Sequence, residues 1–198
     1  MDEKEVALRP LKVISNPGKN YYPENRKWQG IPGVERAKNG LLWACWYSGG
    51  NKEPEPENYA LLVNSEDDGN SWSNPILVVE PSNKVRSFDP VLWHDPLGRL
   101  WFFWNQSFDG YDGRCGVWAI TTTQSHKRNP NWTKPKRLCD GIIMNKPLAT
   151  SYGEWLLPAA IWGREPKLRE FEEIRRPNVY SSRDNGKTWI LKGGVNNI

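Results

Sequence analysis

The sequence has little of the residues that mark several classes of protein. Its 198 residues include three cysteines, two histidines and two methionines. An odd number of widely spaced cysteines fits neither a disulfide framework nor a zinc site. The sequence shows no cluster of histidine and cysteine and no glycine-rich phosphate loop, so we expect no metal ion or other cofactor.

Long apolar runs are also missing. No stretch approaches the ~18 consecutive apolar residues of a transmembrane helix, and the mean hydropathy is −0.75. The first residues read Met-Asp-Glu-Lys-Glu-Val, without the basic region and the apolar stretch of a signal peptide. These features leave the localisation unassigned and give no reason to expect a membrane partner.

An excess of one charge is absent as well. The chain has 27 basic and 23 acidic residues, a net charge of +4, and they are interspersed. This charge is too small and too scattered to predict a nucleic-acid partner. Aromatic residues, in contrast, are abundant: 12 Trp, 7 Tyr and 5 Phe require a packed core and exclude a disordered chain. The 17 Gly and 16 Pro favour many short elements joined by turns.

One order of features occurs three times along the chain. Residues 31–47, 89–104 and 146–162 each run from a proline through a glycine turn to an apolar stretch. The three prolines are spaced by 58 and then 57 residues. Such a regular spacing indicates an internal repeat with a period near 57 residues.

Each repeat contains about four short apolar runs bounded by Gly, Pro, Asn or Asp, which is typical of β-strands. We therefore predict an all-β fold in which four-stranded sheets repeat as the blades of a propeller. The predicted blades cover approximately residues 25–82, 83–140 and 141–198 of one domain, residues 1–198. Residues 167–176 are predicted as a charged loop with one helical turn.

A turn motif occurs in register with this repeat. Residues 65–72 and 182–189 both read Ser-x-Asp-x-Gly-x-x-Trp, and residues 129–132 form a looser copy. The Asp can accept local backbone N–H groups, the Gly can supply a positive φ, and the Trp is expected to fold back between neighbouring strands. This motif resembles the Asp box, the bacterial neuraminidase repeat of the sialidase superfamily, and the resemblance extends from about residue 20 to the end. It indicates the fold more than the function, because these boxes lie on the outer rim of such propellers.

The resemblance implies a sialidase-like β-propeller with six blades around a central pocket. Because the chain holds about three blades, we expect the N-terminal half of a larger protein. Residues 11–15 resemble the strand that closes the ring against the last blade. An open arc of three blades exposes apolar edges, which favours self-association through these edges.

In a propeller the pocket gathers at one end of the inner strands, near the axis. The repeat places Asp89 at this point in the second blade and Asn145 and Lys146 in the third. Sialidases carry an Asp-Pro at the matching point, facing the substrate, so the resemblance predicts Asp89 as a catalytic residue. Asn145 and Lys146 are predicted to bind substrate. For all three, a purely structural role at a strand end is the alternative.

Two arginines are further candidates for substrate binding. Arg86 precedes Asp89 by three residues, and Arg114 lies in a turn before the third run of the same repeat. A guanidinium group can bind a carboxylate through two parallel hydrogen bonds. Both residues are therefore predicted to bind an acidic sugar.

The loop from residue 48 to residue 59 carries three glutamates, at positions 53, 55 and 57. The resemblance places the acid/base residue on a loop leaving the first inner strand, where a carboxylic acid would protonate the leaving glycosidic oxygen. Glu57 is predicted for this role because it lies closest to the next strand. A solvated acidic loop is the alternative.

The leading prediction is a sialidase-like glycoside hydrolase that removes a terminal sugar. This chain would hold only part of the active site, so we expect the fragment alone to be inactive. Sialidases carry Arg-Ile-Pro at the first inner strand, and that Arg helps to clamp the carboxylate of sialic acid. Here Gly30 stands in its place. Because glycine cannot replace a bidentate contact, the identity of the sugar stays open.

Two other functions fit the sequence. A non-catalytic carbohydrate-binding propeller would use amides such as Asn105 and Gln106 together with nearby tryptophans. A structural repeat protein would bind a protein partner through its loops. Both stay open because one fold can host many functions.

Overall fold

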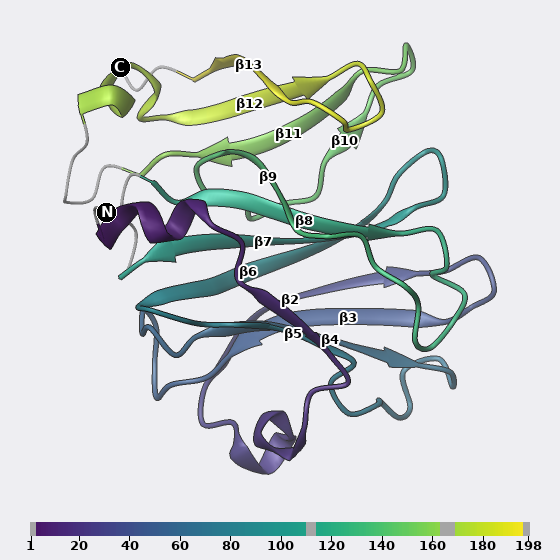
Figure 1. Ribbon diagram of the computed structural model, residues 1–198. Coiled ribbons are helices and arrows are strands. Elements are labelled where there is room, and N and C mark those ends of the chain that lie inside the picture. The colour runs from purple at the N-terminus through teal and green to yellow at the C-terminus, as the bar shows by residue number, and fades with distance from the viewer. Residues whose placement is uncertain (1–2, 110–113, 163–168, 196–198) are drawn as a thin grey trace.

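The computed structural model describes residues 3–109, 114–162 and 169–195. In these residues the chain is all-β, as predicted, and three antiparallel sheets stack one above the other (Figure 1). None of the three sheets closes on itself. Short 3₁₀ helices are the only helical elements described: η1 (Glu3–Leu8), η2 (Lys19–Tyr21), η3 (Pro23–Asn25) and η4 (Arg169–Ile174).

The first sheet has five strands in the order β1-β5-β4-β3-β2, and each of the other two has four strands in chain order. The strands of the first sheet are β1 (Lys12–Ser15), β2 (Gln29–Arg36), β3 (Leu42–Ser48), β4 (Tyr59–Ser65) and β5 (Leu77–Glu80). Those of the second are β6 (Val85–His94), β7 (Leu100–Phe108), β8 (Gly116–Thr122) and β9 (Lys136–Asp140). Those of the third are β10 (Leu148–Ala149), β11 (Trp155–Ala160), β12 (Pro177–Ser182) and β13 (Ile190–Gly194).

The core lies between the sheets. Side chains alternate between the two faces of a strand, so each sheet contributes every second residue to each interface. Trp43 of the first sheet and Phe102 and Trp104 of the second belong to one fully buried cluster. On the other face of the second sheet, Trp101 and Phe103 pack in a cluster with residues of the third sheet. Many of the abundant aromatic residues are therefore buried between the stacked sheets.

Strands β2 and β6 contain the same kind of β-bulge. The pairing of β2 with β3 shifts between Gly30 and Gly33, and that of β6 with β7 shifts between Phe88 and Val91. Each bulge extrudes two residues whose second member is a proline. The first member, Ile31 or Asp89, has a positive φ of 54° or 42°. The sequence repeat and the backbone bulge therefore coincide at Asp89.

The two Ser-x-Asp-x-Gly-x-x-Trp turns have the same hydrogen bonds. In the first, Ser65 Oγ donates to Asp67 Oδ1 at 2.8 Å and accepts the Gly69 N–H at 2.9 Å, and the same aspartate accepts the Ser71 N–H at 2.8 Å. In the second turn, Ser182, Asp184, Gly186 and Thr188 make the corresponding three bonds, each at 2.8 or 2.9 Å. Serine and aspartate thus satisfy the backbone of the turn, as the motif predicts.

Of the three turn tryptophans, two pack against a neighbouring sheet and one does not. Trp189 packs partly buried against the core between the second and third sheets, and Trp132 meets Trp43 edge to face at 6.1 Å. Trp72 is 44% exposed, so the prediction that it folds back between strands is wrong. The first sheet has no described sheet before it against which this indole could pack.

The N-terminal strand is a second correction. β1 was expected to face a last blade, but it pairs antiparallel with β5 at the outer edge of the first sheet. Gln106 holds the segment before β1, because its side-chain amide donates to the carbonyls of Ala7 and Arg9 and accepts the Leu11 N–H. These bonds place residues 7–11 beside the second sheet.

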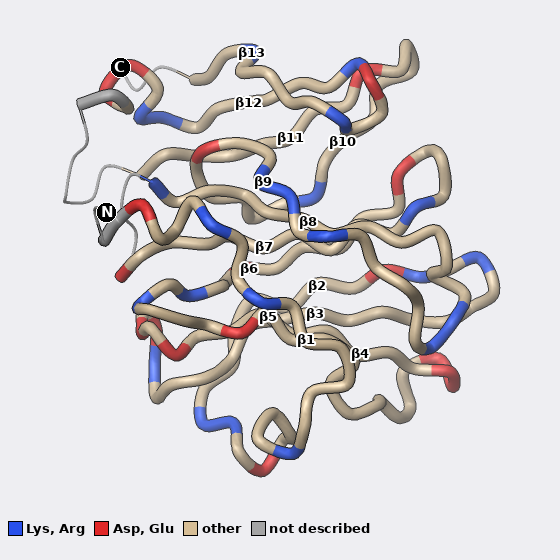
Figure 2. Tube along the Cα trace, viewed as in Figure 1, with Lys and Arg blue, Asp and Glu red and all other residues tan. Residues whose placement is uncertain are grey.

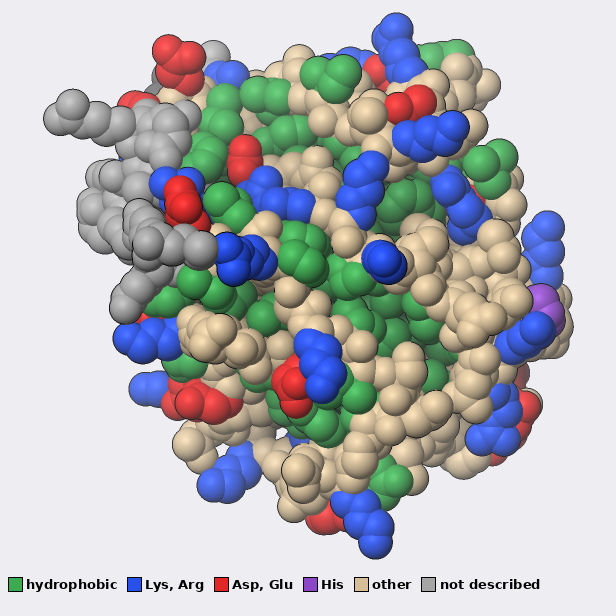
Figure 3. Space-filling view, in the orientation of Figure 1, with side chains coloured by type: hydrophobic (Ala, Val, Ile, Leu, Met, Phe, Trp, Pro, Cys, Tyr) green, Lys and Arg blue, Asp and Glu red, His purple; other side chains and the backbone are tan. Residues whose placement is uncertain are grey.

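The surface is mixed in charge. Basic and acidic residues alternate along the loops and strand ends (Figure 2). Hydrophobic side chains also reach the surface over the uppermost sheet (Figure 3), where Leu148 and Ile190 are 63% and 69% exposed. Among the described residues no helix is long and apolar enough to cross a membrane.

Candidate functional site

Asp89 is a buried carboxyl group in the bulge of β6, and it is only 4% exposed. Burial and, to a smaller extent, the negative charge of Glu53 raise the pKa of Asp89 to about 7, although the nearby Arg86 guanidinium acts in the opposite direction. A buried carboxyl group loses its ionised form because the surroundings cannot solvate the charge. Asp89 therefore remains largely protonated up to neutral pH.

The loop from residue 49 to residue 58 lies against this region, held by the buried amide of Asn58. Its Nδ2 donates to the carbonyls of Gly49 and Lys52 at 2.7 and 3.1 Å, and its Oδ1 accepts the Glu55 N–H at 3.0 Å. The Asn58 carbonyl accepts the Ser87 N–H at 3.1 Å. The side chain of Asn58 therefore ties the loop together, and its backbone carbonyl fixes the loop to β6.

The three glutamates of this loop have different surroundings. Glu55 accepts the Asn51 N–H at 2.6 Å and helps to close the loop. The Glu57 side chain is exposed. The part of Glu57 that lies close to Gly49 is its backbone carbonyl oxygen. Glu53 is the glutamate whose charge acts on Asp89. Glu53 and Glu57 are both exposed, so the effect of the Glu53 charge on Asp89 is what favours Glu53 over the predicted Glu57 as the second carboxylate of a site at Asp89.

Arg86 is fully buried beside Asp89. Its Nη1 donates to Asn58 Oδ1 at 3.1 Å, and its guanidinium carbon lies 3.8 Å from the ring centre of Phe88. A guanidinium held in this way contacts the loop and the strand together. These contacts suit Arg86 to hold the loop and Asp89 in place.

The other three predicted binding residues make the following contacts. Lys146 is exposed and its Nζ lies 2.7 Å from Glu35 Oε1 of β2. Asn145 is exposed, and its Oδ1 accepts the Lys146 N–H at 2.9 Å. Arg114 is half-buried at the start of the segment leading to β8, and its carbonyl accepts a hydrogen bond from Arg137. Their part in substrate binding stays a prediction.

An aromatic cluster lies next to the bulges. Tyr47 and Phe88 are fully buried, 6.3 Å apart between ring centres, and Trp28 lies 4.7 Å from Tyr47. Trp28 also covers Gly30, where an added Cβ would come within 2.8 Å of the indole. The position that carries arginine in the resembling family is thus covered here by an aromatic ring.

Two amides of the carbohydrate-binding alternative are structural. Asn105 exchanges two hydrogen bonds of 2.8 Å with the backbone of Ile143. Gln106 holds the N-terminal segment, as described above. Both side chains are fully buried, so neither reaches a ligand at the surface.

Sequence reasoning missed Asn58 and Glu53. An asparagine directly before an apolar strand is a weak signal for a loop anchor. The choice between the glutamates depends on how the loop folds over β6, which no local pattern encodes. Among the described residues, no group of three or more His, Cys, Asp or Glu could hold a metal ion.

The fold is similar to those of solved sialidases and other glycoside hydrolases. The chain superimposes on the K499G mutant of the NanB sialidase from Streptococcus pneumoniae with a TM-score of 0.62 and 10% identity, covering 94% of this chain and 46% of that one. For the Hadza microbial sialidase Hz136 the TM-score is 0.60 and the identity 14%, with 82% and 37% covered. For Zg3597, a family 117 glycoside hydrolase from Zobellia galactanivorans, the TM-score is 0.56 and the identity 13%, and the match covers 92% of this chain and 60% of that one.

At these identities the likeness concerns the fold alone, and the chain spans roughly one third to three fifths of each structure's length. No curated protein matches the sequence. The sequence pattern of one family, described as a BNR repeat-like domain, matches residues 40–198. This match covers most of the chain, with the first repeat included from residue 40 and the second and third in full. The chain therefore belongs to the sialidase-like BNR repeat superfamily.

Proposed function

We propose that this chain forms part of the active site of a glycoside hydrolase that removes a terminal sugar from a glycan, with Asp89 as an acid group. The observation that carries the proposal is the buried Asp89, whose pKa lies near 7 in a strand bulge at the inner edge of a sheet. A carboxyl group that is protonated near neutral pH can give its proton to a leaving glycosidic oxygen.

Glycoside hydrolysis uses two carboxyl groups with different protonation states. Asp89 supplies the protonated one. Glu53 is the second, because its charge acts on Asp89. The charge of an ionised neighbour keeps the proton on the buried acid, which separates the two roles. Glu57, the residue predicted from the sequence, serves in this proposal only through its backbone.

The substrate side of the site is aromatic where the sialidases have an arginine. Trp28 covers Gly30, and an indole offers a flat apolar face on which the C–H groups of a sugar ring can pack. This arrangement supports a sugar that needs no carboxylate clamp at this point. In this proposal Arg86 positions Asp89 and Arg114 contributes to substrate binding. Lys146 and the neighbouring Asn145 are assigned no substrate contact, because Lys146 pairs with Glu35 near the end of β2 that lies away from the bulge.

The three sheets are, in this proposal, three blades of a six-bladed propeller. The two similar sialidases are about twice as long as this chain, which supports further blades in the complete site. The exposed apolar side chains of the third sheet, including Leu148 and Ile190, support a neighbour on that side. That neighbour can be the next blade or a second copy of the chain.

The proposal is tested with a panel of aryl glycosides that carry neutral and acidic terminal sugars. In the full-length protein, which supplies the rest of the site, we expect release of the aryl group from at least one sugar class, and a loss of roughly 100-fold or more in the Asp89→Asn variant. Asp68→Asn is the matched control, because this exposed aspartate pairs with Arg36 and plays no part in the proposed chemistry. Equal hydrolysis by wild type and Asp89→Asn would contradict the role of Asp89.

The alternative is a carbohydrate-binding propeller without catalysis, which the aromatic cluster beside Asp89 favours. Ligand-detected NMR with the same sugars separates the two functions. A hydrolase bearing Asp89→Asn binds its sugar and does not cleave it. A binding module shows binding without cleavage in the wild type as well, and Trp28→Ala then removes the binding.

A further inference from the structure

A second group of chemically competent side chains lies away from Asp89, where the first and second sheets meet. Glu35 lies in β2, His94 ends β6, and Ser125 lies in the loop after β8. His94 Nδ1 is 3.1 Å from Glu35 Oε2, and His94 Nε2 is 3.1 Å from Ser125 Oγ. The three side chains form one line, carboxylate to imidazole to hydroxyl.

This order is the arrangement that activates a serine nucleophile. The imidazole can take the proton of the hydroxyl, and the carboxylate orients the ring and stabilises its charged form. Both distances lie within the hydrogen-bond range that such a relay requires. Because the three residues come from separate parts of the chain, no spacing in the sequence reveals them.

The carboxylate of this relay is held ionised. Its side chain is 14% exposed, and Lys146 Nζ lies 2.7 Å from Glu35 Oε1, on the oxygen that His94 does not contact. Although burial works in the opposite direction, the hydrogen bonds from His94 and Lys146 hold the pKa of Glu35 below its ordinary value. A carboxylate with both oxygens engaged keeps the imidazole in one orientation.

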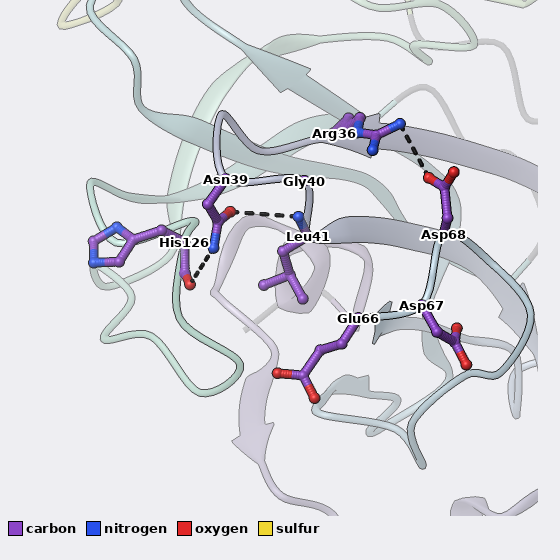
Figure 4. A pocket seen from close by; sticks show the side chains of 8 residues that line it. All are labelled: Arg36, Asn39, Gly40, Leu41, Glu66, Asp67, Asp68 and His126. Carbon is purple, nitrogen blue, oxygen red and sulfur yellow. Dashed lines mark hydrogen bonds and ion pairs between the residues drawn. The ribbon is translucent and has the colours of Figure 1, made fainter.

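The loop that carries the serine is fixed at three points. Trp43 Nε1 donates to the Ser125 carbonyl at 2.8 Å, and Asn39 Nδ2 donates to the His126 carbonyl at 3.0 Å (Figure 4). A turn is closed by the Lys127 N–H and the Gln124 carbonyl at 2.9 Å.

The relay borders a cavity of about 420 Å³. Beside the three relay residues, its wall includes Arg36, Lys38, Asp95, Leu97 and Thr123. Ser125 is 8% exposed, so a small group rather than a long chain can approach its hydroxyl. The two cations and the Thr123 hydroxyl favour a polar alcohol on the other side of the scissile bond.

We propose that Ser125, His94 and Glu35 form a hydrolytic site for short acyl esters of polar alcohols, separate from the site at Asp89. Ser125 Oγ bonds to the acyl carbon while its proton passes to His94 Nε2. The ester C–O bond breaks and His94 returns the proton to the alcohol oxygen. Water then adds to the acyl carbon through the same base, and the acid leaves as Ser125 regains its proton.

A fluorophosphonate probe tests the site directly, because it forms a stable bond with an activated serine. We expect one adduct, located on Ser125 by peptide mass spectrometry, and p-nitrophenyl acetate hydrolysis that the adduct blocks. Ser125→Ala removes both, and His94→Gln slows labelling by about 100-fold or more. Ser71→Ala, which alters an exposed hydroxyl of the first turn motif outside this cavity, labels like the wild type.

Folding does not confuse this test. The bond from Trp43 uses the backbone carbonyl of Ser125, so it survives in Ser125→Ala, and an unchanged thermal midpoint verifies this. A wild type that takes no adduct, or takes it equally in Ser125→Ala, overturns the proposal. Asp89→Asn is expected to label normally, which separates this site from the glycoside hydrolase proposal.

Discussion

Asp89 occupies in β6 the place that Ile31 occupies in β2. Both residues lie in a bulge, both precede a proline, and both have a positive φ, of 42° and 54°. A positive φ is unfavourable for residues with a side chain, so the surrounding pairing must impose it. The same backbone device therefore presents an apolar side chain in one sheet and a buried acid in the next.

The Asp89→Asn variant should be more stable than the wild type at neutral and alkaline pH. Below about pH 4 the aspartate is protonated in both the folded and the unfolded chain, so the two proteins are alike. Between pH 4 and 7 the unfolded chain ionises, with an ordinary pKa of 3.8, while the folded chain keeps its proton up to a pKa of about 7. The wild type therefore loses stability as the pH rises.

The gap should reach up to about 4 kcal/mol above pH 7, at ~1.4 kcal/mol for each unit of pKa difference. Urea unfolding at pH 4 and pH 8 measures it. An equal difference between the two proteins at both pH values would show that Asp89 is not held protonated by burial.

The Glu53→Gln variant should lower the pKa of Asp89, because the negative charge of Glu53 raises it. Glu57→Gln should leave that pKa unchanged, because Glu53 and Arg86 are the charged side chains that act on Asp89. NMR titration of the Asp89 carboxyl carbon in the two variants makes the comparison. If Glu57→Gln has the larger effect, the assignment of the second carboxylate to Glu53 is incorrect.

The Ser182→Ala variant should be destabilised by about 1–2 kcal/mol through the loss of buried hydrogen bonds. The Ser182 hydroxyl donates to Asp184 and accepts the Gly186 N–H, and the residue is 2% exposed. Ser181→Ala is the control, because this neighbouring residue lies on the opposite face of β12. Chemical denaturation of both variants provides the measurement, and equal losses would refute a special role of the turn.

The Gly186→Ala variant should lose more stability than Gly98→Ala. Both glycines have a φ of +80°, but an added Cβ at Gly186 would lie 2.8 Å from Trp101 and 2.9 Å from Trp155, whereas none of the described atoms lies within 4 Å at Gly98. The shared backbone strain costs ~1–2 kcal/mol, and overpacking adds ~1–3 kcal/mol at Gly186 alone. Thermal unfolding should rank the two variants; similar midpoints would contradict the predicted close packing of this turn.

The repeated sheets could be predicted because their signals are local. Alternating apolar runs and the turn motif lie within a few residues of each other, and they predicted strands such as β4, β7 and β12. The position of β1 depends on its pairing with β5, more than 60 residues away. No local pattern distinguishes that partner from a strand in a later blade, so the prediction failed there.

The candidate sites divide in the same way. Asp89 could be singled out because the repeat aligns it with the starts of the other inner strands. Glu53 could not be preferred over Glu57, because the choice depends on how Asn58 folds the loop onto β6. The line from Glu35 through His94 to Ser125 exists only after two sheets have packed together.

The most direct measurement is the pKa of the Asp89 carboxyl group, followed by carbon-detected NMR through a pH titration with Asp89→Asn to assign the signal. A value near 7 would show that the chain keeps a protonated acid at neutral pH, as a proton donor to a glycosidic oxygen requires. A value near 4 would show an ordinary ionised aspartate and would contradict the proposed role of Asp89.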